Sequence, residues 1–178
     1  MRKPFRLAFA AAALLAASLV TVHAAGMLPI VGEVAPAFTL PSQTGAQISL
    51  KSFRGKWVVL YFYPRDMTTG CTIEAHNFQR DLKQYEALNA VILGVSVDSV
   101  DSHKQFCAKD GLTFHLLSDA QHKVVTEYGS LGSFKSVSIA DRNTFLIDPQ
   151  GRIVKVWTKV DPAVHSAEVL AALKELKE

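Results

Sequence analysis

The sequence contains only two cysteines, Cys71 and Cys107, and it has no Cys-x-x-Cys pair, because position 74 is Glu. A protein that carries electrons as a dithiol needs such a pair, so this function is disfavoured. The six histidines are scattered and do not stand beside the cysteines at the spacing of a zinc-ligand set. We therefore expect no bound metal and no prosthetic group, and the two thiols need another explanation.

Long apolar runs are also missing, with one exception near the N-terminus. The segment Leu7–Val22 is almost wholly apolar, but its 16 residues fall short of the roughly 20 that cross a bilayer as a helix. Three basic residues precede this run, and small residues follow it around Ala24. This order is typical of a secretory signal peptide. We expect residues 1–24 to be removed on export to the periplasm, which leaves no stable membrane association; an uncleaved membrane anchor is the alternative.

The mature domain lacks an excess of charge of either sign. The whole chain has 19 basic and 16 acidic residues, and residues 1–24 contain three basic residues and no acidic one. The remaining residues, 25–178, are therefore formally neutral, which argues against a nucleic-acid partner. No repeat, low-complexity tract or Pro/Gly/Ser-rich linker divides them, so we expect one domain.

Apolar periodicity predicts an alternating order of strands and helices. Short alternating segments flank the turn-rich stretch 41–45, which indicates an N-terminal β-hairpin. Continuous apolar runs predict buried strands, and spacings of three and four predict helices. The expected elements after the hairpin are strands at 57–63, 91–97 and 114–117, helices at 71–89, 102–109 and 121–128, a hairpin at 143–158 and a closing helix at 163–177. This order favours an α/β protein with a thioredoxin-like fold, a mixed central sheet flanked by helices.

The most informative residues lie between the expected strand 57–63 and the helix that follows it. Cys71 stands at the predicted helix start, where free N–H groups and the positive end of the helix dipole stabilise a thiolate. Pro64, Thr68 and Cys71 have the spacing Pro-x3-Thr-x2-Cys, which resembles the signature of peroxiredoxins, a family of thiol peroxidases. The resemblance implies that Cys71 is the nucleophile, that Thr68 hydrogen-bonds the peroxide and that Pro64 shields the site from water.

A second part of the resemblance supplies charged residues. The segment 141–148, Asp-Arg-Asn-Thr-Phe-Leu-Ile-Asp, is similar to a peroxiredoxin strand that carries an arginine. The resemblance assigns to Arg142 the stabilisation of the thiolate and of the leaving oxygen. Glu74, one helical turn after Cys71, is similar to an acidic residue of the family that orients this arginine. Alternatively, Glu74 is a solvated acid in the first turn of the helix, where the dipole favours negative charge.

The resemblance covers nearly the whole mature domain, from the opening segment 31–38, Val-Gly-Glu-Val-Ala-Pro-Ala-Phe, to the last helix. The short length without inserts resembles the bacterioferritin-comigratory, or Q-type, peroxiredoxins. Two positions depart from the common pattern: Thr69 replaces a proline, and His76 stands where many Q-type members have a second, resolving cysteine. Cys107 in the next helix is similar to the resolving cysteine of another Q-type branch.

The resemblance implies an atypical two-cysteine peroxidase that acts in antioxidant defence on hydrogen peroxide and organic hydroperoxides. The Cys71 sulfenic acid would condense with Cys107, and a thioredoxin-like protein would reduce the resulting disulfide. Because the two thiols lie on separate helices, we expect the site to unravel locally during turnover. Family usage implies a monomer.

Three alternatives stay open. The two cysteines of an exported protein can form a permanent disulfide, in which case the chain is a non-catalytic binding module. The fold also permits a thioredoxin-like thiol carrier, despite the missing Cys-x-x-Cys pair. Finally, Cys107 can be a buried free thiol that packs as a small apolar residue, and an external thiol then resolves Cys71.

Overall fold

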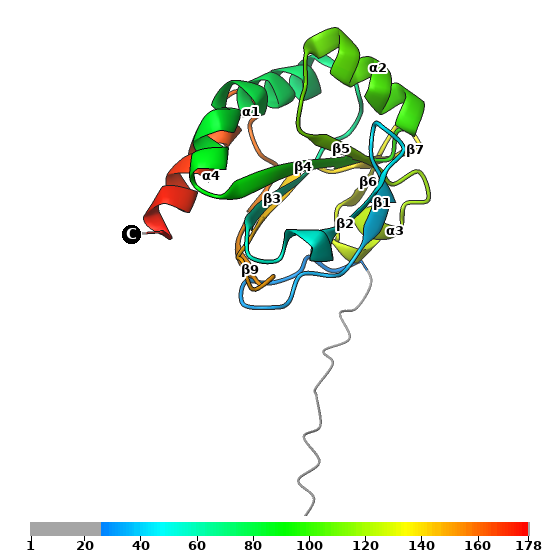
Figure 1. The fold of residues 1–178 in the computed structure, drawn as a ribbon. Helices are drawn as coiled ribbons and strands as arrows, with labels where there is room; N and C mark the ends of the chain where they lie inside the picture. Colours follow the sequence, from blue (N-terminus) through cyan, green and yellow to red (C-terminus); the bar gives the residue numbers. More distant parts are fainter. Residues whose placement is uncertain (1–25, 178) are drawn as a thin grey trace, which may run out of the picture.

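The computed structural model describes residues 26–177, so the expected signal peptide, residues 1–24, lies outside the described residues. In the described part a central sheet is covered by helices on both faces, as predicted for the thioredoxin-like fold (Figure 1). In chain order the elements are β1 Thr39–Pro41, β2 Gln47–Ser49, the 3-10 helix η1 Leu50–Phe53, β3 Trp57–Phe62, α1 Thr69–Ala87, β4 Ala90–Ser96, α2 Val100–Asp110, β5 His115–Ser118, α3 Lys123–Glu127, β6 Leu131–Phe134, β7 Val137–Ala140, β8 Asn143–Ile147, β9 Ile153–Thr158 and α4 His165–Glu175. No helix among residues 26–177 combines the length and the apolar character needed to cross a membrane.

The central sheet has five strands in the order β5-β4-β3-β8-β9. Strand β3 pairs in parallel with β4 and antiparallel with β8, so the sheet is mixed, as predicted. In the middle of β3, Leu60 stands between Leu93 of β4 and Phe145 of β8. The central position of β3 explains its continuous apolar run, because both of its faces are covered.

Alternate side chains of β3 divide between two apolar cores. Val58 and Leu60 belong to the core with α3, η1 and the β1-β2 hairpin, whereas Val59 and Tyr61 belong to the core with α1, α2 and α4. Each fully buried side chain of this size stabilises the fold by about 1.5–3 kcal/mol. Cys71 is part of the second core, so the candidate site is built on a packed face of the sheet.

Helix α2 begins two residues before its predicted start because its first turn is capped. The hydroxyl oxygen of Ser99 accepts a hydrogen bond from the backbone N–H of Ser102 at 3.2 Å, which satisfies a donor that the helix itself leaves free. At the other end Gly111 adopts a left-handed φ of 65°, and its N–H donates to the carbonyl oxygen of Cys107. Cys107 therefore lies in the last turn of α2 rather than in the middle of the helix.

The sequence pattern does not predict the small hairpin formed by β6 and β7. Phe134 pairs with Val137, so only Lys135 and Ser136 form the turn, and both have left-handed φ values of 48° and 66°. Such a two-residue turn usually carries Asn-Gly or Asp-Gly, since these residues adopt positive φ at little cost. The Lys-Ser pair lacks this signal, so the residues of the turn do not predict the hairpin.

Candidate active site

The β3-α1 connection brings Cys71 to the surface of the second core. Strand β3 ends at Phe62, and α1 starts at Thr69, so Cys71 lies in the first turn of a 19-residue helix. Its side chain is buried, with 2% of its surface exposed. At this place the backbone N–H groups of the first helical turn and the positive end of the helix dipole stabilise a thiolate. The predicted position of Cys71 at a helix start is confirmed.

Arg142 reaches the same place from the strand next to β3 in the sheet. It directly precedes β8, which pairs antiparallel with β3. Its Nη2 donates a hydrogen bond to Cys71 Sγ at 3.1 Å, and its Nη1 donates to Glu74 Oε2 at 2.5 Å. One planar guanidinium group thus bridges the thiol and a carboxylate, which the point charge of a lysine does less well. The structure brings together Cys71 and Glu74 of α1 with Arg142, the three charged or nucleophilic residues that the sequence singles out.

Glu74 is not the solvated acid that the alternative interpretation describes. Its side chain is 1% exposed, and Oε1 has no hydrogen-bond partner among the described residues. Burial raises the pKa of Glu74 to about 7, while the charge and the hydrogen bond of Arg142 act in the opposite direction. A carboxyl group with this pKa changes its charge in the neutral range, so the pairing with Arg142 depends on pH.

The glycine before Cys71 has a steric reason that the sequence analysis missed. A Cβ atom at Gly70 would lie 2.9 Å from Nη2 of Arg142. The guanidinium group lies over the backbone of Gly70, and a side chain there would force it to shift away from its place beside Cys71. The Gly-Cys dipeptide is visible in the sequence, but Arg142, the residue that lies over this glycine, is brought there only by the pairing of β8 with β3.

Thr68 and Pro64 lie in the loop between β3 and α1. Thr68 occupies the N-cap position of α1, and its exposed hydroxyl donates to the carbonyl oxygen of Arg65 at 3.0 Å. Pro64 is half-buried. Both residues line a groove of about 810 Å³ between the β3-α1 loop and the β6-β7 hairpin, with Val97, Phe134, Val137 and Ile139 among its apolar walls. The roles of Thr68 and Pro64 toward a peroxide stay predictions.

Cys107 packs against the same apolar core as Cys71, but from α2. Both cysteines are free thiols in this structure, and Cys107 is half-buried. Burial raises the pKa of Cys107 to about 11, with a further contribution from the negative charge of Asp66. The Cys107 side chain is therefore a neutral thiol at physiological pH in this arrangement. Its resolving role stays a prediction.

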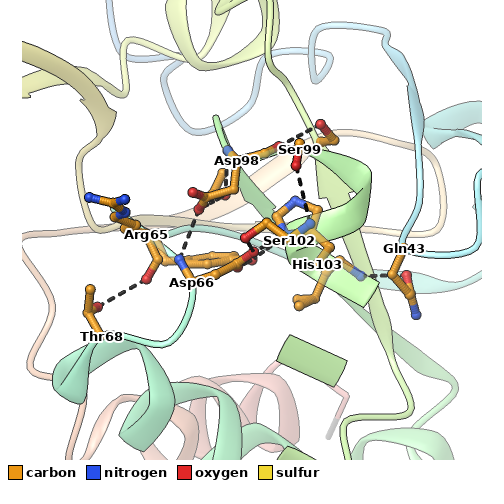
Figure 2. A network of polar contacts seen from close by, with 12 residues as sticks. Gln43, Arg65, Asp66, Thr68, Asp98, Ser99, Ser102 and His103 are labelled. Atoms are coloured by element: carbon orange, nitrogen blue, oxygen red, sulfur yellow. Dashed lines mark hydrogen bonds and ion pairs between the residues drawn. The ribbon is translucent and has the colours of Figure 1, made fainter. Parts of the chain in front are cut away.

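A buried polar cluster beside the site was not found by sequence reasoning. Asp66, in the loop between β3 and α1, lies within hydrogen-bond distance of Ser102 and His103 of α2 (Figure 2). Ser102 and His103 follow Asp66 by 36 and 37 positions in the chain, and none of the three belongs to a spacing pattern that indicates a contact. Only the parallel pairing of β3 with β4 brings the loop and the helix to the same edge of the sheet.

The described geometry agrees with comparisons with known proteins. The AhpC/TSA family matches residues 31–156. Among curated proteins, "Peroxiredoxin Bcp" of Bacillus subtilis (strain 168) is 41% identical over 152 residues, which cover 83% of this chain and 97% of that protein. "Peroxiredoxin Bcp" of Xanthomonas campestris pv. campestris is 44% identical over 148 residues, which cover 79% of this chain and 91% of that protein.

Solved structures lead to the same group. The structure of the Xanthomonas campestris bacterioferritin comigratory protein superposes with a TM-score of 0.75 at 39% identity, covering 79% of this chain and 92% of that one. A PrxQ variant from Xylella fastidiosa gives a TM-score of 0.77 at 37% identity, covering 82% of this chain and 98% of that one. The thiol, the arginine and the buried glutamate thus lie on a fold shared with these proteins over most of its length. The chain belongs to the AhpC/TSA family and, within it, to the Bcp or Q-type peroxiredoxins, which are thiol-dependent peroxidases.

Proposed function

We propose that Cys71 is the nucleophile that reduces hydroperoxides, and that Arg142, oriented by Glu74, stabilises the charge that moves in this reaction. The observation that carries the proposal is the guanidinium group, which donates to Cys71 Sγ and to the buried Glu74 at the same time. A preorganised cation of this kind stabilises a thiolate and a departing oxygen without reorganisation during the reaction. A permanent structural disulfide would give no reason for such an arrangement.

In the first step the Cys71 thiolate attacks one oxygen of the hydroperoxide, and the O–O bond breaks. The bonding electron pair leaves on the second oxygen, which takes up a proton and departs as water or as an alcohol. The sulfur, oxidised by two electrons, becomes a sulfenic acid. Thr68 takes part by turning its hydroxyl from the Arg65 carbonyl toward the peroxide, and Pro64 limits the access of water.

In the second step the sulfur of Cys107 attacks the sulfenic sulfur of Cys71. A disulfide forms and one water molecule leaves, which takes the sulfenic oxygen and two protons. The two cysteines start on different helices, α1 and α2, and Cys107 is packed in the core. We infer that the last turn of α2 opens in this step, so that the two Cα atoms come within the roughly 4.4–6.8 Å that a disulfide allows.

Both hydrogen peroxide and organic hydroperoxides fit this proposal as substrates. The groove beside Thr68 has apolar walls that can accommodate an organic substituent. The structure of the Xanthomonas relative is described in terms of alkyl peroxide reduction by that protein. An antioxidant role follows from this chemistry.

The cycle needs an external reductant and a place in which to work. We propose a thioredoxin-like dithiol protein, which reduces the Cys71–Cys107 disulfide by exchange and is itself oxidised to a disulfide. The basic, apolar and small-residue order of residues 1–24 supports export to the periplasm, where this reductant must also be present. The resemblance to Q-type peroxiredoxins supports a monomer.

The test compares hydroperoxide consumption by the purified wild type, Cys71→Ser and Cys107→Ser with a dithiol reductant. Cys71→Ser should abolish turnover. Cys107→Ser should consume one equivalent and then stop as a sulfenic acid, which a dimedone probe and mass spectrometry detect. If Cys71→Ser retains full activity, the peroxidase assignment of this thiol is wrong. If Cys107→Ser turns over at the wild-type rate without an added monothiol, Cys107 is not the resolving residue.

A further inference from the structure

Three residues join the loop before Cys71 to the helix that carries Cys107. Asp66 lies in the β3-α1 loop, and Ser102 and His103 lie in the first turn of α2. Ser102 Oγ donates to Asp66 Oδ2 at 2.6 Å, and His103 Nδ1 lies 2.8 Å from the same oxygen. Figure 2 shows these side chains turned toward one another between the loop and the helix. We call Asp66, Ser102 and His103 the α2 clasp.

The clasp is shielded from water. The side chains of Asp66 and His103 are 1% and 0% exposed, and the second carboxylate oxygen of Asp66 accepts a hydrogen bond from the buried hydroxyl of Tyr63 at 2.7 Å. Burial acts to raise the pKa of Asp66, but its contacts with His103, Ser102 and Tyr63 outweigh burial and lower it. Charge-assisted hydrogen bonds in such surroundings are stronger than those at the surface. These hydrogen bonds therefore stabilise the contact between the β3-α1 loop and α2.

A second contact fixes the same loop from its backbone side. The backbone N–H of Asp66 donates to Asp98 Oδ2 at 2.9 Å, and the hydroxyl of Ser96 donates to the same oxygen at 2.7 Å. Asp98 directly precedes the N-cap residue of α2. The loop before Cys71 is thus held against the beginning of α2 by both the side chain and the backbone of Asp66.

The clasp and Cys107 lie on the same side of α2. His103 and Cys107 are four residues apart, so their side chains are neighbours on one face of the helix. This face packs against the core that contains Cys71, where Phe106 of the same helix is also buried. In the two-cysteine cycle Cys107 leaves this core, and it does so by movement or unravelling of a helix whose first turn the clasp anchors.

We propose that the α2 clasp is a positioning element that sets the rate at which Cys107 reaches the Cys71 sulfenic acid. The proposal rests on the proposed peroxidase cycle and adds a rate-controlling contact to its second step. A closed clasp keeps α2 folded and Cys107 packed, whereas the backbone contact of Asp66 with Asp98 holds the loop before Cys71 independently of Ser102. Weakening the clasp speeds disulfide formation and leaves the first step unchanged. The clasp also prolongs the life of the sulfenic acid, which a second peroxide can oxidise further to a sulfinic acid with release of water or alcohol.

The test uses two serines that donate to a buried or nearly buried aspartate. Ser102→Ala removes one clasp hydrogen bond, whereas Ser166→Ala removes the bond from Ser166 Oγ to Asp81 Oδ2, 2.8 Å long, which joins α4 to α1 away from α2. The wild type, both variants and Ser102→Thr, which keeps the hydroxyl, are mixed in reduced form with one equivalent of hydrogen peroxide. Rapid quenching, thiol alkylation and mass spectrometry then separate sulfenic acid formation from disulfide formation.

Ser102→Ala should form the disulfide about ten- to 100-fold faster than the wild type, since this is the change that the loss of one hydrogen bond to a charged group produces. Sulfenic acid formation should be equally fast in all four proteins, and Ser166→Ala and Ser102→Thr should form the disulfide at the wild-type rate. A merely structural role for Ser102 would lower thermal stability, as in Ser166→Ala, without speeding any step. Equal rates of disulfide formation in Ser102→Ala and Ser166→Ala overturn the proposal.

A second measurement is independent of peroxidase activity. In the reduced proteins without peroxide, Cys107 should react with iodoacetamide faster in Ser102→Ala than in Ser166→Ala, because opening of α2 exposes the thiol. No sulfenic acid in any of the proteins would contradict the proposed function, and the alkylation rates would still decide on the clasp. Equal alkylation rates at Cys107 in the two variants count against the clasp, whatever the peroxide experiment gives.

Discussion

The two cysteines share one apolar core but have opposite surroundings. Cys71 lies in the first turn of α1, buried, with the guanidinium group of Arg142 3.1 Å from its sulfur. Cys107 lies in the last turn of α2, half-buried, where burial raises its pKa to about 11. The helix dipole favours an anion at the first position and disfavours it at the second. The comparison teaches that one thiol lies beside a cation and a helix N-terminus, while burial keeps the other neutral.

The two halves of the proposed cycle therefore need different properties of the fold. Attack on peroxide needs a fixed geometry, and charged groups from α1 and from the residue before β8 provide it. Disulfide formation needs movement, and Cys107 is held by apolar packing in a short helix that can open locally. The predictions below change one of these surroundings at a time.

The largest effect is expected when the guanidinium group is removed from the surroundings of Cys71. Arg142→Lys keeps a positive charge but loses the planar fork that contacts Cys71 and Glu74 together. The second-order rate constant for hydroperoxide should fall about 100- to 1000-fold, the usual cost of losing one preorganised donor to a developing charge. Stopped-flow measurement of peroxide consumption checks this.

Arg152→Lys is the matched control for Arg142→Lys. Arg152 is an exposed arginine whose Nη1 donates to the carbonyl oxygen of Gly32, far along the chain from the cysteines. This variant should react at the wild-type rate. Iodoacetamide should alkylate Cys107 at the same rate in both variants, because Arg142→Lys changes the surroundings of Cys71 and not those of Cys107. If Arg142→Lys reacted with peroxide at the wild-type rate, the guanidinium group would not be what distinguishes the surroundings of Cys71 from those of Cys107.

Much of the fold could be predicted because its signals are local. The buried run of β3 and the glycine after α2 each specify their element from neighbouring residues. The β6-β7 hairpin could not be predicted, because Lys135 and Ser136 adopt left-handed angles without the usual turn residues. The start of α2 was missed by two residues, since the cap at Ser99 was not recognised.

The candidate site shows the same division between local and distant signals. Cys71 was predicted at a helix start from the strand and loop before it, and Arg142 came from a family resemblance rather than from spacing. The burial of Glu74 and the requirement for glycine at position 70 depend on a guanidinium group that arrives from a distant strand. The contact of Asp66 with His103 likewise joins parts of the chain that only the sheet brings together.

A smaller effect is expected when the negative charge beside Arg142 is removed. Glu74→Gln keeps the shape of the side chain but cannot ionise. Because the pKa of Glu74 is raised to about 7, the carboxylate that orients Arg142 forms as the pH rises through this range. The rate of peroxide attack in Glu74→Gln should be about tenfold below that of the wild type at pH 8, a cost typical of a misplaced catalytic group. The difference should shrink toward pH 6, and peroxide consumption from pH 6 to 8 measures it.

The same ionisation has the opposite effect on stability. The pKa of Glu74 is higher in the folded protein than its ordinary value of 4.5, so the stability that this group contributes is present at low pH and is lost as the pH rises to about 7. Glu74→Gln should therefore lose less thermal stability than the wild type between pH 5 and pH 8. If the rate and the thermal stability of Glu74→Gln depended on pH as they do in the wild type, a group other than Glu74 would cause both dependences.

The smallest effect is expected at the end of α2, next to Cys107. Gly111 ends the helix with a left-handed φ of 65°, and Gly111→Ala strains this turn by about 1 kcal/mol. The last turn should open more often, and the reduced protein should be alkylated at Cys107 about fivefold faster. Gly55→Ala is the control, since Gly55 also has a positive φ, 85°, with open space around its Cα, but it lies between η1 and β3. Equal Cys107 alkylation in both variants would show that this thiol is released by a movement that does not begin at the end of its helix.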